Sequence, residues 1–189
     1  MNYTIISAPI HGDFVEIDKV KLKEYFNWYR NQMPERIGHL ESFVNESEGF
    51  ENWRADCSPE SLMALGEWYA NQISTVKSEV VDFQKGHYSY NLVRRVFSDK
   101  TYSLIHDLSM YLSCVFFKNY PQLVLKQELG SKNSIDYGYP VISGFGKVNF
   151  NPVRMLDTLT YRLLDHPTDT TRLFGLYEIW RNDIPTNQK

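Results

Sequence analysis

The sequence contains few of the residues that mark a covalent framework or a metal site. It has two cysteines, Cys57 and Cys114, and one pair does not make the disulfide framework of a small secreted domain. We expect Cys114, which lies in an apolar helical stretch, to be a buried and reduced thiol. The five histidines show no zinc-type spacing, and there is no Cys-x-x-Cys pair. The sequence therefore predicts no metal site and no cofactor.

Strong charge and long apolar runs are missing as well. The net charge is −3, from 20 basic and 23 acidic residues, so no basic face for nucleic acid is indicated. No window is long and apolar enough to span a membrane. The first residues lack a basic segment followed by an apolar one, so we expect no signal peptide. These absences favour a soluble protein of the reducing cytoplasm.

The glycine-rich stretch "DYGYPVISGFGKVNFNP", residues 136–152, does not have the spacing that phosphate binding requires. A P-loop needs Ser or Thr after Gly-Lys, and Val148 stands there. A dinucleotide fingerprint needs a third glycine and a following helix, but this chain has Asn149 and a strand-like "KVNF". We interpret the stretch as a strand, a tight turn with Gly146 at positive φ, and a second strand.

A catalytic nucleophile is also hard to find. Ser143 lacks the flanking glycines of a nucleophile elbow. Cys57 precedes a helix start, where a thiol pKa can fall, but the neighbouring Asp56 opposes a thiolate. His106 and Asp107 are adjacent on a helix and so point in different directions. The sequence leans towards a protein that is not an enzyme.

The strongest pattern in the sequence is the helical periodicity of its apolar residues. Apolar residues at helical spacing predict helices at about 19–32, 34–47, 58–73, 98–120, 151–165 and 168–183. Asp18, Ser58, Ser98 and Asn151 are the expected N-caps. Pro34 is expected to break or kink the first helical stretch. The pattern fades at 80–97, and "GHYSYN", residues 86–91, is typical of a loop.

The period changes after Pro121. Leu123, Leu125 and Leu129 alternate with polar residues, and "PVIS" and "KVNF" are two further short strands. Short connections make the pairing antiparallel. The sequence thus predicts a mainly helical α+β fold, with about five or six helices and a small antiparallel sheet near 123–150. We expect one domain over 1–189, with a helical layer at 18–120 and C-terminal helices at 151–183.

Two features favour binding over catalysis. Residues 41–60 hold six acidic residues against one basic residue, and Glu46, Glu48, Glu51 and Trp53 lie among them. An acidic surface with an embedded ring suits a basic protein partner. Tyr137 and Tyr139 beside the predicted hairpin also suit an interface, since tyrosines offer rigid contact area. The alternative for the rings of both groups is that they pack into the core.

The stretches "SPESLMALGEWYANQI" and "DYGYPVISGFGKVNFNP" resemble motifs of small cytoplasmic bacterial proteins of unassigned function. Some proteins of this size and acidity resemble toxin-immunity proteins. The resemblance implies a bacterial, cytoplasmic and non-enzymatic protein. We therefore expect a domain that binds another protein in an immunity or adaptor role.

Two alternatives remain open. One is an enzyme of unrecognised type with a cleft between its helices, which buried ionisable groups with shifted pKa values would favour. The other is a homo-oligomer that associates through its aromatic residues.

Overall fold

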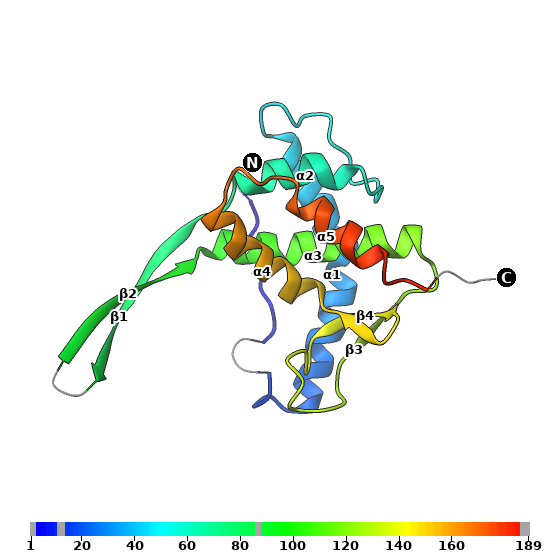
Figure 1. The fold of residues 1–189 in the computed structure, drawn as a ribbon. Coiled ribbons are helices and arrows are strands. Elements are labelled where there is room, and N and C mark those ends of the chain that lie inside the picture. Colours follow the sequence, from blue (N-terminus) through cyan, green and yellow to red (C-terminus); the bar gives the residue numbers. More distant parts are fainter. Residues whose placement is uncertain (1–2, 11–13, 86–87, 186–189) are drawn as a thin grey trace.

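The computed structural model describes residues 3–10, 14–85 and 88–185, with the backbone alone described at 78–85 and 88–95. In these residues the chain has five helices and two antiparallel sheets, so the predicted mainly helical α+β fold is confirmed (Figure 1). The elements in order are α1 (Lys19–Asn45), α2 (Ser61–Ala70), β1 (Thr75–Lys85), β2 (Tyr88–Phe97), α3 (Asp99–Asn119), β3 (Val124–Gln127), β4 (Pro140–Phe145), β5 (Val148–Phe150), α4 (Pro152–Asp165) and α5 (Arg172–Arg181).

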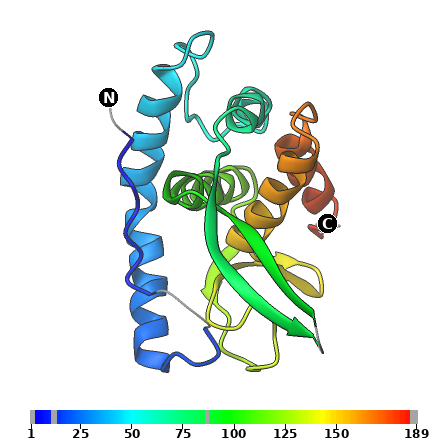
Figure 2. The same ribbon diagram turned by 90° about the vertical axis from the view of Figure 1, so that its left-hand side faces the viewer.

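Helix α3 lies at the centre, with α1 on one side and α4 on the other (Figure 2). It is buried on nearly every face, as expected for a helix that is apolar nearly all round. Its predicted N-cap is confirmed, because the Ser98 hydroxyl accepts a hydrogen bond from the Thr101 amide. Asn151 caps α4 in the same way, through the Arg154 amide, with Pro152 in the first helical position.

Helix α1 runs unbroken through Pro34, so the predicted break is wrong. A proline inside a helix removes one backbone hydrogen bond, here to the carbonyl of Arg30. Tyr29 on one side and Arg36 and Leu40 on the other are all buried. Buried residues on both sides of the proline anchor the helix, which stays continuous despite the missing bond.

The small sheet forms where it is predicted, in the order β3-β4-β5. Gly146 takes φ +62° in the turn between β4 and β5, so the predicted glycine turn is confirmed. Phe145, just before it, is fully buried against Phe116 and Trp180. The glycines of this stretch therefore allow backbone conformations that other residues rarely adopt. Strand β4, which ends at Phe145, packs against the core.

Residues 75–97 correct the sequence prediction. The stretch that looks irregular forms a long two-stranded hairpin, β1–β2, which reaches out of the helical body (Figure 1). Of the predicted loop at 86–91, residues 88–91 lie in β2, and 86–87 lie outside the described residues. The pairing register shifts between Lys77 and Val80. Such a bulge reverses the phase of side-chain alternation, which hides a strand in the sequence pattern.

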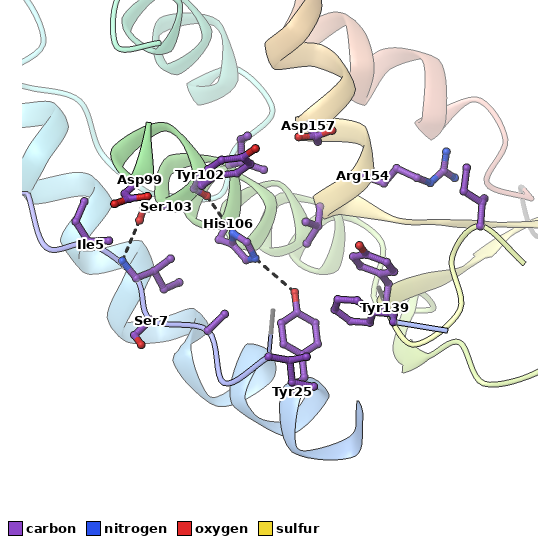
Figure 3. Close-up of a pocket in the computed structure, with 17 residues that line it drawn as sticks. Ile5, Ser7, Tyr25, Asp99, Tyr102, Ser103, His106, Tyr139, Arg154 and Asp157 are labelled. Atoms are coloured by element: carbon purple, nitrogen blue, oxygen red, sulfur yellow. Dashed lines mark hydrogen bonds between the residues drawn. The ribbon is translucent and has the colours of Figure 1, made fainter. Parts of the chain in front are cut away.

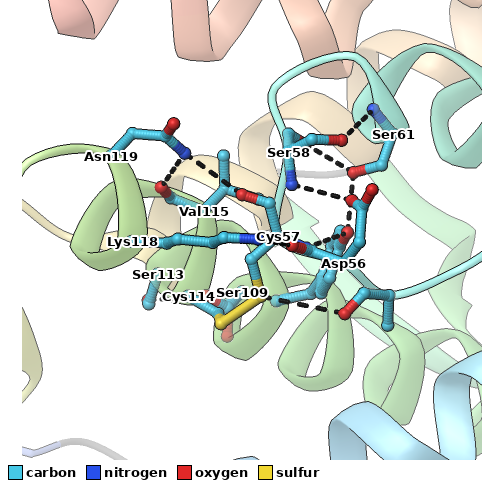
Figure 4. The surroundings of a disulfide bond; sticks show 12 residues. Asp56, Cys57, Ser58, Ser61, Ser109, Ser113, Cys114, Val115, Lys118 and Asn119 are labelled. Carbon is cyan, nitrogen blue, oxygen red and sulfur yellow. Dashed lines mark hydrogen bonds between the residues drawn. A yellow bond between two sulfur atoms is a disulfide. The ribbon is translucent and has the colours of Figure 1, made fainter.

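The two cysteines also correct a prediction. Cys57 and Cys114 form a disulfide with a Cα–Cα distance of 5.8 Å, so Cys114 is not a reduced thiol and Cys57 is not a free nucleophile (Figure 4). The bond fixes the loop after α1 to the C-terminal half of α3. Asn119 adds a hydrogen bond of 3.1 Å from its side-chain amide to the Cys57 carbonyl, and Lys118 donates to the Asp56 carbonyl.

None of the helices in the described part of the chain has the length and apolar character that a bilayer span requires.

Candidate functional site

The structure separates the residues predicted to bind a partner into two distant groups. Glu46, Glu48 and Glu51 are exposed on the loop that follows α1. Tyr137 and Tyr139 lie in the loop before β4, which packs near the first turns of α1 (Figure 1). Helix α1 has 27 residues and so spans about 40 Å between these two places. The two groups do not form one surface.

Two of the predicted rings belong to the core. Trp53 is 7% exposed, its ring packs edge-on against Tyr111 at 5.3 Å, and its indole N–H donates to the Ser61 carbonyl at 3.0 Å. Tyr137 is 2% exposed and packs with Phe14, Leu22 and Tyr25. Neither ring is available to a partner. Tyr139 is half-buried and lines a cavity that the sequence did not reveal.

This cavity, of about 780 Å³, is the pocket that we regard as the candidate site (Figure 3). Its walls come from segments far apart in the sequence: residues 5–10, α1, the first half of α3, the loop before β4, and α4. Most of the lining is apolar, including Ile5, Ile6, Ala8, Ile105 and Val153. A mainly apolar cavity of this size with a few convergent polar groups is the usual form of a small-molecule site.

Aromatic rings form one wall of the pocket. Phe14 stacks on Tyr139 with ring centroids 4.1 Å apart, and it meets Tyr25 edge-on at 5.1 Å. Tyr25 in turn stacks on Trp28 at 5.5 Å. Each ring is held by its neighbour, so this wall is formed before any ligand arrives.

His106 brings a polar group into the pocket from α3 (Figure 3). Its Nδ1 lies 3.0 Å from the Tyr102 carbonyl, which can only accept, so Nδ1 carries the proton. In the neutral imidazole, Nε2 is then the acceptor of a long hydrogen bond of 3.4 Å from the Tyr25 hydroxyl. Burial raises the pKa of Tyr25 well above its ordinary value, so this hydroxyl remains a donor.

The charged groups of the pocket lie on α4 and at the start of α3. Arg154 is paired with Asp136, with Nε 2.7 Å from a carboxylate oxygen. Asp157, one turn further along α4, is half-buried. Burial raises the pKa of the Asp157 carboxyl above its ordinary value. Among residues whose side chains the structure describes, none gives Asp157 a hydrogen bond or an ion pair.

A buried polar cluster fixes the N-terminal segment that forms the outer wall. Arg36 on α1 makes two hydrogen bonds to Asp107 on α3, of 2.7 and 2.8 Å, and a third to the Thr4 carbonyl. Tyr3 donates from its hydroxyl to the same carboxylate at 2.5 Å. The Ile6 amide donates to the Ser103 hydroxyl at 3.0 Å. The segment therefore follows α1 closely (Figure 2).

Sequence reasoning missed this pocket because Tyr25, His106 and Asp157 are distant in the chain. One signal was present: Asp157 lies four residues after Val153, on the buried face of an amphipathic helix. An acidic residue on such a face needs a partner or a function. No residue type or spacing in the sequence indicates that His106 and Tyr25 line the same pocket as Asp157.

Comparison with protein-family models, with curated proteins and with solved structures found no match. Within the described residues, no group of three histidine, cysteine or acidic residues is arranged to hold a metal ion.

Proposed function

We propose that the protein binds a small organic molecule in the pocket between the N-terminal segment, α1, α3 and α4. The observation that carries the proposal is the cavity of about 780 Å³ with preformed aromatic and apolar walls. A few polar groups, Tyr25, His106 and Asp157, supply orientation. Two ionisable groups in the lining, Tyr25 and Asp157, have pKa values raised by burial, which is common at functional sites.

The test uses N-phenylnaphthylamine, a neutral dye that fluoresces in apolar surroundings. We expect saturable binding at one site of the native protein. Ala8 lines the pocket and is half-buried, so the Ala8→Phe variant fills part of the cavity and weakens binding by about tenfold or more. Ile179 is 66% exposed on α5, and the Ile179→Phe variant adds similar bulk away from the pocket.

Equal dye binding by these two variants, or no saturable binding by the native protein, would overturn the proposal. Melting temperatures of both variants show whether any loss reflects unfolding.

Protein binding by the acidic loop is a second candidate function. It rests on the exposure of Glu46, Glu48 and Glu51 and on the disulfide that fixes this loop to α3. A preformed acidic surface favours capture of a basic partner. In this role the protein is an immunity- or adaptor-type bacterial protein.

The experiment for this candidate is capture of partners from a host lysate. Changing Glu46, Glu48 and Glu51 together to Lys should abolish salt-dependent capture. The control changes Glu16, Glu24 and Glu67 to Lys, which alters net charge equally at exposed positions elsewhere. If both triple variants retain the same proteins as the native chain, the acidic loop is not a docking site.

The cytoplasmic location also remains a prediction, and the disulfide between Cys57 and Cys114 weighs against it. Structural disulfides persist in oxidising compartments and are rare in the reducing cytoplasm.

A further inference from the structure

We infer that the pocket is selective for an organic cation, an ammonium group on an apolar body, which places its charge beside Asp157. The inference rests on the proposed function, since it names the class of ligand that the same pocket takes. Three properties of the lining carry it: the balance of charge, the aromatic walls and the absence of a metal-binding arrangement in the described residues.

Among the lining residues that the structure describes, the balance of permanent charge is negative. Two carboxylates, Asp99 and Asp157, line the cavity, and Arg154 is the cation that the described lining contributes. The charge of Arg154 is already neutralised, because its guanidinium contacts both carboxylate oxygens of Asp136 at 2.7 and 3.3 Å. An anionic ligand would have to compete with that pair. A cationic ligand finds the half-buried carboxylate of Asp157, which has no partner among the described side chains.

The unfavourable burial of the charged Asp157 carboxylate indicates that a ligand with a positive charge would be stabilised beside it. Burial raises the pKa of this carboxyl by removing water from its charged form, and no cation among the described side chains pairs with it. A ligand ammonium group would provide that stabilisation, and the apolar surroundings would strengthen the attraction. The interaction is thus largest for a ligand that brings a positive charge to this part of the pocket.

The aromatic wall favours the same class of ligand. Phe14, Tyr25 and Tyr139 line the cavity, and aromatic rings attract a cation that comes within about 6 Å of the ring centre. The same rings offer apolar surface to the body of the ligand. An ammonium group on a hydrocarbon body therefore satisfies both the carboxylate and the rings.

An inorganic cation does not fit this lining. Metal ions require several oxygen, nitrogen or sulfur ligands converging on one point. The described residues contain no group of three such side chains in that arrangement. Most of the lining is hydrocarbon, which a bare ion could not use. The charge must therefore be attached to an apolar molecule.

The test compares decylammonium, decanol and decanoate as competitors of N-phenylnaphthylamine, below their micelle-forming concentrations. The three share one chain and differ in charge. We expect decylammonium to displace the dye at a concentration about tenfold lower than decanol, with decanoate weakest. In the Asp157→Asn variant, decylammonium and decanol should displace the dye at equal concentrations, once each is corrected for the affinity of that variant for the dye.

The matched control is Asp165→Asn, the same change at an exposed position of α4 outside the pocket. It should leave the tenfold preference in place. The melting temperature of Asp157→Asn should equal or exceed that of the native protein, because the change removes a carboxylate that burial disfavours.

The outcomes separate the two proposals. If the dye does not bind saturably, the proposed function fails. If the dye binds but decanol or decanoate competes as well as decylammonium, the cation preference fails and the pocket stands. Equal loss of preference in both variants would also overturn the assignment to Asp157.

Discussion

The Arg36–Asp107 pair connects three segments through a few atoms. Arg36 is 4% exposed and Asp107 fully buried, and the Arg36 side chain also reaches the N-terminal segment at the Thr4 carbonyl. Burial and the charge of Asp107 raise the pKa of Tyr3, so its hydroxyl stays protonated and donates to Asp107. Additional hydrogen bonds of this kind offset part of the cost of taking both charges out of water.

We predict that Arg36→Met lowers the free energy of unfolding by about 3 to 5 kcal/mol, because it leaves the Asp107 carboxylate buried without its cation. Arg54→Met is the control. Arg54 pairs with Glu41 at 3.8 Å, and its side chain is 61% exposed, so the loss should be at most about 1 kcal/mol. Urea denaturation measures the free energy of unfolding of both variants. Similar losses in the two variants would contradict the role given to the buried pair.

Tyr29 links stability to alkaline pH. It is fully buried, and burial raises its pKa from 10.0 to about 12. Between these values the unfolded chain loses the phenol proton while the folded protein keeps it. The unfolded state then binds fewer protons, so stability falls as pH rises through this interval.

The expected contribution of Tyr29 is about 1.4 kcal/mol of unfolding free energy per pH unit across that interval. Other buried tyrosines add similar slopes, so the test is the difference between the native protein and Tyr29→Phe. The variant should lose stability less steeply above pH 10. Parallel curves of unfolding free energy against pH would contradict the assignment.

At the scale of elements, replacing glycine by alanine is expected to have opposite effects on stability at two helical positions. Gly38 lies inside α1, and an added Cβ would meet nothing within 4 Å. Gly66 lies in α2 against α5, and an added Cβ would stand 2.6 Å from the Thr170 carbonyl oxygen and 3.2 Å from the Leu173 Cβ. The first position is open and the second is a close helix contact.

We expect Gly38→Ala to raise the free energy of unfolding by about 0.5 to 1 kcal/mol, since alanine loses less backbone entropy in a helix. Gly66→Ala should lower it by about 1 to 3 kcal/mol, because α2 and α5 must separate. Thermal unfolding distinguishes the two. A destabilised Gly38→Ala or a stabilised Gly66→Ala would show that the helices pack differently.

Helix boundaries could be predicted from the sequence where they depend on neighbouring residues. The caps Ser98 and Asn151 and the turn at Gly146 follow from local chemistry. The β1–β2 hairpin could not, because its bulge interrupts the alternation that marks a strand. Pro34 likewise shows that tertiary packing outweighs a local helix breaker.

The site was less predictable than the fold. The pocket depends on Tyr25, His106 and Asp157, which three different helices bring together. Composition and spacing within one segment carry no information about which residues of different helices lie close together in the fold. The predicted surface residues illustrate the same limit, since the rings of Trp53 and Tyr137 are in the core while the acidic side chains beside Trp53 are exposed.

At the scale of the whole molecule, the disulfide joins two regions separated by 57 residues in the sequence. Closing a long loop restricts the unfolded chain and so stabilises the folded state. We predict that reduction lowers the free energy of unfolding by about 2 to 4 kcal/mol. Cys114→Ala should have the same effect, and adding reductant to that variant should change nothing further.

Urea denaturation with and without reductant measures the effect, and mass spectrometry after alkylation counts free thiols. Two alkylated cysteines in the unreduced native protein would contradict the pairing of Cys57 with Cys114.

The central claim is that the pocket between the N-terminal segment, α1, α3 and α4 binds a small organic molecule. Amide chemical-shift mapping at saturating N-phenylnaphthylamine tests it most directly. We predict saturable shifts concentrated at residues 5–10 and around Tyr25, His106 and Asp157. Shifts confined to the acidic loop around Glu48, or no saturable shifts at all, would contradict it.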